Sequence, residues 1–133
     1  MKTRPVLTLE DCRKISAAAE AEAKRNQWNV CIANLDDGGH LLHLVRMDGA
    51  SPANARIAIE KGRTAAESRR SSAVWEERIK AGRNSMLGMP GITPVQGGLP
   101  IIVEGICVGG VGVSGVQSHE DEQIAAAGIK ALA

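Results

Sequence analysis

Apolar residues recur at three- and four-residue spacing over several stretches of the chain, the pattern of helices that bury one face. The first stretch predicts a helix over residues 9–25, because Thr8 is a good N-cap residue and Asp11 follows it three positions later. Ser51-Pro52 is a favourable helix start, with serine as the cap and proline at the first helical position. A shorter helix is predicted over residues 73–81.

Strands are predicted where β-branched and apolar residues lie between turn signals. Residues 29–35 are apolar on both parities, which is typical of a strand covered on both faces. A glycine-containing turn connects them to residues 40–48, which we expect to return as a second strand. Residues 97–115 predict a hairpin in which Glu104-Gly105 forms the two-residue turn.

The last helix is predicted to begin at Ser118, with Asp121 as a capping-box partner. The resulting order is helix, two strands, helices, hairpin and helix. This order predicts an α+β fold with an antiparallel sheet. At 133 residues the chain is long enough for one hydrophobic core, and we treat residues 1–133 as a single domain.

Glycines dominate the second strand of the predicted hairpin. Glycines at positions 109, 110 and 112 weaken a strand unless another backbone, a helix or a flat ligand lies close against it. The sequence GGVGVSG does not have the strand, GxGxxG and helix order of a dinucleotide site, so we expect no nucleotide cofactor. Gly110 and Gly112 are candidate contacts for a flat cofactor.

Composition narrows the classes of function. Charged residues make up 23% of the chain and the formal net charge is +1, without a basic patch typical of nucleic-acid binding. The chain has no Phe or Tyr and only two Trp, so it lacks the stacking platforms of a single-strand binder. No apolar run is long enough for a signal peptide or a membrane span, which favours a cytoplasmic protein. Three widely separated cysteines predict buried thiols and not a disulfide or zinc framework.

Residues 82–98 form the longest stretch without a regular pattern. Glycine and proline are too dense there for a helix or strand, while methionine, leucine and isoleucine side chains make the segment apolar. Long irregular segments of this kind are usually functional or part of an interface. We therefore expect the chain, a ligand or another subunit to cover it.

Three segments carry a resemblance to a known protein family. They are GGLPIIVEGICVGGVGVSGVQSHEDEQIAAAG at residues 97–128, NLDDGGHLLHLVRMDGA at 34–50 and IAIEKGRTAA at 57–66. Together they resemble the GlcG/HbpS family, which includes the C-terminal domain of the PduO corrinoid adenosyltransferases. The similarity extends over nearly the whole chain.

The resemblance implies a profilin-like α+β fold with a five-stranded antiparallel sheet flanked by helices. It also implies assembly into homo-oligomers, often octamers, and the binding or degradation of haem by some members. One departure concerns the helix that follows Thr64. The family usually has an aromatic residue where this chain has Ser68, so aromatic packing against a tetrapyrrole is not expected at that position.

The three histidines are candidates for chemistry, and none has the spacing of a metal site. His40 lies in a turn and is expected to be exposed. His43 lies inside a strand, where a hydrogen-bonded core histidine competes with a role as cofactor ligand. His119 begins a helix beside Glu120, Asp121 and Glu122, and is a candidate haem ligand, general acid or general base; its alternative is a surface residue.

Arg46 lies on the same strand face as Leu42 and Leu44, where an arginine needs a partner or solvent. Asp48 is the structural partner that the sequence offers. In the functional interpretation, Arg46 holds a substrate carboxylate or a haem propionate.

Two functional hypotheses follow, with a plainer third. The first is an oligomer that binds haem or a related tetrapyrrole through His119, His43 and Arg46, accessory to a catabolic pathway. The second is a cofactor-independent lyase or isomerase for a small oxo- or hydroxy-acid, with Arg46 as carboxylate clamp and His119 as acid/base. The third is an accessory subunit without chemistry of its own.

Overall fold

The computed structural model describes all of residues 1–133. Its elements in chain order are α1 (Leu9–Arg25), β1 (Cys31–Asp36), β2 (Leu41–Arg46), α2 (Pro52–Ser68), α3 (Ala73–Lys80), the 3-10 helix η1 (Asn84–Gly88), β3 (Gly98–Val103), β4 (Ile106–Ser114) and α4 (Ser118–Lys130). The predicted helices are confirmed, and α1 has the predicted bounds with Thr8 and Asp11 in a capping box. None of the helices is both long and apolar enough to cross a membrane.

The sheet has four strands in the order β2-β1-β4-β3, and every neighbouring pair is antiparallel. The α+β class is therefore confirmed, whereas the expectation of five strands is wrong. Between α3 and β3 the chain forms η1 and an irregular loop, because glycine and proline are too dense there for a fifth strand. The hairpin turn is confirmed, with positive φ at both Glu104 (52°) and Gly105 (78°).

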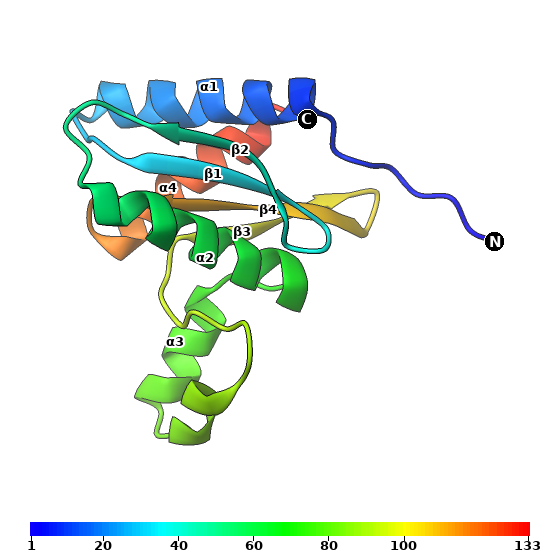
Figure 1. The fold of residues 1–133 in the computed structure, drawn as a ribbon, viewed down its shortest axis with the longest axis vertical. Coiled ribbons are helices and arrows are strands. Elements are labelled where there is room, and N and C mark those ends of the chain that lie inside the picture. The colour runs from blue at the N-terminus through cyan, green and yellow to red at the C-terminus, as the bar shows by residue number, and fades with distance from the viewer.

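Helices cover both faces of the sheet (Figure 1). Helices α1 and α4 pack against each other and against one face, where Ile15, Ile32 and Ile124 belong to the main core. Helix α2 covers the other face and packs on Cys31, Ala33 and Leu35 of β1. Strand β1 is thus buried on both faces, as its continuous apolar run predicts.

The bare strand β4 is the surface on which α2 rests. A Cβ at Gly112 would overlap the carbonyl oxygen of Ala58, and one at Gly110 would lie 2.5 Å from the carbonyl oxygen of Gly62. The glycines therefore bring a helix backbone against the strand, which is one of the alternatives that the sequence left open. Gly62 of α2 complements them, since a Cβ there would lie 2.8 Å from the Gly112 nitrogen.

Residues 69–96, called the arm from here on, project away from the sheet on the side of α2 (Figure 1). The arm contains α3, η1 and the loop that returns to β3. Met86 is buried within it, but Leu87 is 66% exposed and Met89 40% exposed. Cover of this apolar segment by a ligand or another subunit stays a prediction.

Candidate functional site

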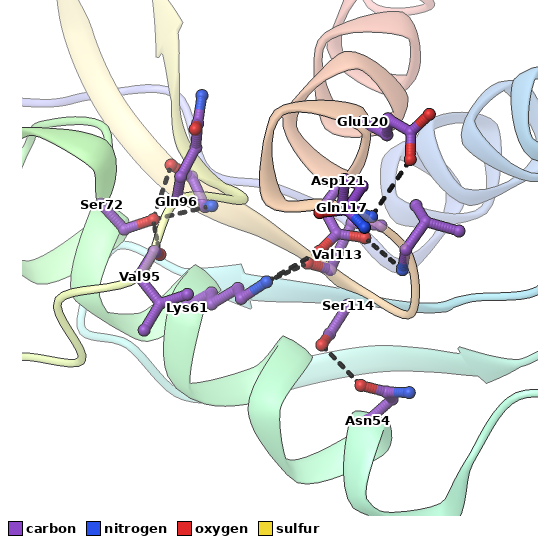
Figure 2. A network of polar contacts seen from close by, with 12 residues as sticks. Asn54, Lys61, Ser72, Val95, Gln96, Val113, Ser114, Gln117, Glu120 and Asp121 are labelled. Carbon is purple, nitrogen blue, oxygen red and sulfur yellow. Dashed lines mark hydrogen bonds and ion pairs between the residues drawn. The ribbon is translucent and has the colours of Figure 1, made fainter. Parts of the chain in front are cut away.

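A buried ion pair joins α2 to the start of α4 (Figure 2). The Lys61 ammonium donates to Asp121 Oδ2 at 2.9 Å and to the Val113 carbonyl oxygen at 3.1 Å. The second oxygen of Asp121 accepts from the Val116 backbone N–H at 3.1 Å. Both side chains are at most 3% exposed, so the pair is isolated from solvent.

The charge balance at Asp121 reflects two opposing effects. The pKa of its carboxyl group is raised above the ordinary value because burial dominates, and the hydrogen bond and charge of Lys61 and the Val116 N–H offset only part of this rise. Asp121 was expected to cap α4, but the structure corrects this interpretation. The cap is Gln117, whose capping-box partner is Glu120, because the helix register places Asp121 one residue deeper, facing Lys61.

The base of the arm is attached beside this ion pair. Ser72 Oγ donates to the Val95 carbonyl oxygen at 2.6 Å and accepts from the Gly98 N–H at 2.9 Å. Gln96 Nε2 donates to Glu122 Oε2 at 3.1 Å, and Ser71 Oγ donates to the other oxygen of Glu122 at 2.9 Å. The two bonds to Glu122 fix the base of the arm to α4, whereas Ser72, shown in Figure 2 beside Val95, ties the two ends of the arm together.

A second polar network places His43. Asn34 Nδ2 donates to Ser16 Oγ at 2.7 Å, and Ser16 Oγ lies 3.0 Å from His43 Nδ1. Asn34 and Ser16 are buried, and Asn34 Oδ1 has no hydrogen-bond partner. His43 is half-buried and hydrogen-bonded, as predicted, and its Nε2 makes no hydrogen bond within the chain.

His43 lies on an edge strand that leaves apolar side chains uncovered. Strand β2 pairs only with β1, so its other edge is free. Leu41, Leu42 and Leu44 are between 36% and 46% exposed. We call these leucines together with His43 and Arg46 the β2 edge.

Arg46, the last residue of β2, is exposed and does not pair with Asp48, so the structure corrects the predicted partner. The turn after the strand brings the Ala50 carbonyl oxygen within 3.3 Å of Arg46 Nε, which donates to it. The two terminal nitrogens of Arg46 have no partner within the chain.

His119 is exposed on the first turn of α4. Its acidic neighbours are already engaged, Glu120 with the Gln117 backbone N–H and Glu122 with the arm. His40 is also exposed, as predicted, and its Nδ1 lies 3.3 Å from Asp36 Oδ1.

The predicted site residues are only partly brought together. His43 and Arg46 share β2, whereas His119 belongs to α4, which packs on α1, β3 and β4. No contact joins Arg46 to His119 within the chain, so a joint acid/base role for them stays a prediction for an assembled oligomer. Gly110 and Gly112 lie beneath α2 against its backbone.

Sequence reasoning missed Lys61, Ser16 and Asn34. One signal for Lys61 was present, since it lies three residues after Ala58 and four before Ala65, inside the small-residue stripe of α2. A lysine on a buried stripe indicates an ion pair or a functional group. Ser16 and Asn34 gave no comparable signal, because their partners lie 18 and 27 residues away in the chain.

Comparison with known proteins gives a consistent picture. Residues 7–130 match the family model described as haem degrading protein HbpS-like. The chain is 46% identical over 114 residues to the protein GlcG of Escherichia coli K12, covering 86% of this chain and 85% of that protein.

Solved structures share the same fold. A double mutant of HbpS from Streptomyces reticuli is 31% identical and superposes with a TM-score of 0.92, covering all of this chain and 91% of that one. A PduOC:heme complex is 24% identical with a TM-score of 0.86, covering 96% and 95% of the two chains. At that identity the second likeness concerns the fold alone.

Proposed function

Because the chain belongs to the HbpS-like family of haem-degrading proteins, we propose that it binds haem or a related tetrapyrrole at the β2 edge. The HbpS structures and the PduOC:heme complex support this proposal through their fold and, for the latter, through the ligand of that protein. The observation that carries the proposal is the imidazole of His43, which is hydrogen-bonded through Nδ1 only, on a strand flanked by exposed leucines.

The residues of the β2 edge fit the chemistry of haem. A histidine whose Nδ1 is held by a hydrogen bond offers Nε2 as an axial ligand. Leu41, Leu42 and Leu44 offer apolar contact to a porphyrin. Arg46 lies three residues beyond His43 and on the opposite face of β2, because Arg46 pairs with Cys31 on the α2 side whereas His43 faces Ser16 of α1. Its terminal nitrogens are free to pair with a propionate that reaches that face around the free edge of the strand.

Each side chain has a distinct part in binding. Ser16 and Asn34 orient the imidazole from the buried side, where Asn34 is fully buried. The exposed leucines would shield a porphyrin bound across the free edge of β2 from water, and Arg46 would pair with one of its carboxylates. When bound, haem would supply an iron centre for ligand binding or redox chemistry.

Assembly into a homo-oligomer completes the proposal. A porphyrin lying on an edge strand has a second face, and a second copy of the chain would shield both that face and the free edge of β2. The exposed Leu87 and Met89 of the arm support an interface between subunits as well.

Titration of the purified protein with hemin, followed in the Soret band, tests the proposal. The intact chain is expected to give a saturable shift that His43→Ala abolishes. His119→Ala is the matched control, because it removes an exposed imidazole with no hydrogen-bond partner and is expected to leave the shift unchanged. Absence of a saturable shift would overturn haem binding, and a loss in His119→Ala but not in His43→Ala would move the site to α4.

A further inference from the structure

A hollow of about 410 Å³ lies where the C-terminal end of α2 meets the arm. Trp75 of α3 lines it, as do Met89 and Ile92 from the loop that follows η1. Arg70 and Arg78 border the same space. The hollow therefore combines apolar walls with two cationic side chains, and it contains none of the residues of the β2 edge.

Neither arginine is neutralised within the chain. The side chains of Arg70 and Arg78 make no ion pair and no hydrogen bond. Glu67, near the C-terminal end of α2 and three residues before Arg70, also lines the hollow. The carboxylate of Glu67 turns toward two glycines instead. A Cβ at Gly39 would lie 2.5 Å from its Oε1, and one at Gly91 would lie 3.1 Å from its Oε2.

Arg78 is held in a defined orientation. Its guanidinium carbon lies 5.0 Å from the centroid of the Trp75 ring, a cation–π contact. Trp75 is itself fixed, because its Nε1 donates to Ser68 Oγ at 3.2 Å and Ser68 Oγ donates to the Thr64 carbonyl oxygen at 2.6 Å. Stacking on one face leaves the N–H edge of a guanidinium free for a planar acceptor.

The apolar wall is also anchored. Buried Thr64 accepts the Thr93 backbone N–H through Oγ1 at 2.8 Å, which fixes the loop carrying Met89 and Ile92 to α2. Because the segments that line the hollow are already fixed, they lose little conformational entropy when a ligand binds. Its volume lies within the range of about 300–1,000 Å³ found for small-molecule sites.

We propose that this hollow binds a small carboxylic acid with a compact apolar body. The guanidinium of Arg78 takes the carboxylate through paired N–H donors, Arg70 adds a second positive charge, and the body of the ligand rests on Met89 and Ile92. A bare phosphate would leave the apolar wall exposed to water, so the pairing of charge with apolar surface selects a carboxylate. The site is separate from the β2 edge and does not depend on haem.

Tryptophan fluorescence provides a direct readout. Trp28→Phe leaves Trp75 as the sole tryptophan, so changes in emission report the hollow. Benzoate and isobutyrate, as aromatic and branched aliphatic probes, are expected to bind saturably. The probe with the higher affinity shows whether the apolar wall binds an aromatic or an aliphatic group better. Benzamide, which has the same ring without the charge, is expected not to bind.

Substitutions test the role of the arginine. Arg78→Gln is expected to weaken carboxylate binding by about 10- to 100-fold, the effect of losing a hydrogen bond to a charged group. Arg78→Lys keeps the charge but not the paired donors and is expected to be intermediate. Arg56→Gln removes an exposed arginine of α2 outside the hollow and is expected to change nothing.

Three results would overturn the proposal. The first is no saturable binding of either carboxylate, which is also the result if a second copy of the chain fills the hollow. The second is equal binding of benzamide, and the third is an equal loss in Arg78→Gln and Arg56→Gln. Thermal unfolding of each variant identifies any loss of binding that comes from loss of the fold.

Discussion

The ammonium group of Lys61 lies 2.9 Å from the carboxylate of Asp121, and these two residues, 60 positions apart in the sequence, connect α2 to α4. Each charged atom has further partners, the Val113 carbonyl oxygen for Lys61 and the Val116 N–H for Asp121. Both side chains are at most 3% exposed, so solvent does not replace a missing partner. The stability of the junction between α2, α4 and β4 therefore depends on both charges being present.

Removal of one charge from this pair is expected to be costly. Lys61→Met leaves the Asp121 carboxylate buried without its counter-ion and should lower the free energy of unfolding by about 3–5 kcal/mol. Adding Asp121→Asn removes the unpaired buried charge and keeps an acceptor for the Val116 N–H. The double variant should therefore regain part of the lost free energy of unfolding. Urea unfolding of the three proteins measures this.

The matched control for that experiment is the exposed ion pair of Lys80 and Glu76 on α3. Lys80→Met should leave the unfolding midpoint nearly unchanged, because solvent replaces the lost partner. If Lys61→Met were no more destabilising than Lys80→Met, the buried pair would not be a structural link.

Gly112 is expected to tolerate no side chain. A Cβ there would overlap the Ala58 carbonyl oxygen in the backbone of α2, which cannot move away as a flexible side chain could. Gly112→Ala should therefore destabilise the protein by about 1–3 kcal/mol or more, the cost of overpacking a core. Gly88→Ala is the control, because nothing lies within 4 Å of that position. Equal thermal midpoints for the two variants would contradict the close approach of α2.

The sequence predicted those features of the fold that depend on local patterns. The bounds of α1 and the Glu104-Gly105 turn each follow from residues near one another in the chain. The glycines of β4 indicated a close approach, and the structure selects the backbone of α2 from the alternatives that the sequence left open. The expectation of a fifth strand was wrong because it came from the family resemblance alone, and no segment of this chain had been assigned to that strand. A family resemblance can therefore give the correct fold class and still give the wrong number of strands.

The site was harder to predict because its contacts are long-range. Asp121 has the spacing of a capping residue, and only the placement of α2 shows that it faces Lys61. Asp48 is near Arg46 in sequence, yet the turn offers the Ala50 carbonyl oxygen instead. Ser16 reaches His43 from a different helix. None of these pairings has a signature in the local sequence.

A contact between α1 and α4 makes stability sensitive to acid. Gln123 Nε2 donates to Glu22 Oε2 at 2.7 Å, and this bond, followed by the one from Arg25, lowers the pKa of Glu22 below 4.5. A lowered pKa means that the unfolded chain takes up the proton first as pH falls. The stabilisation is thus present above pH 4.5 and lost as pH falls through the pKa of the folded state.

Gln123→Leu should raise the pKa of Glu22 toward its ordinary value and make the loss of stability in acid shallower. Titration of the Glu22 carboxyl carbon by NMR, with urea unfolding at each pH, measures both effects. An unchanged pKa in Gln123→Leu would show that Arg25 and Asn26, the other two partners of the carboxylate, account for its lowered pKa.

The arm is expected to take part in self-association. Leu87 is 66% exposed at its tip, and an exposed apolar side chain beside Met89 is typical of an interface. Leu87→Glu should lower the molar mass measured by light scattering during gel filtration. Val6→Glu, at an equally exposed position in the N-terminal tail, should leave it unchanged. A monomeric parent protein would contradict the prediction outright.

Ser16 is expected to act on haem through His43. Its hydroxyl lies 3.0 Å from His43 Nδ1 and fixes the imidazole, so Ser16→Ala should weaken hemin binding by about 10- to 100-fold, the usual effect of losing a partner of a metal-ligating histidine. The Soret maximum of the saturated complex should stay near that of the intact protein, because His43, the proposed iron ligand, is retained. Ser114→Ala, which removes a hydroxyl bonded to Asn54 on the α2 side, is the control and should bind hemin normally. Equal affinities for the two serine variants would mean that the buried network serves the fold and not the ligand.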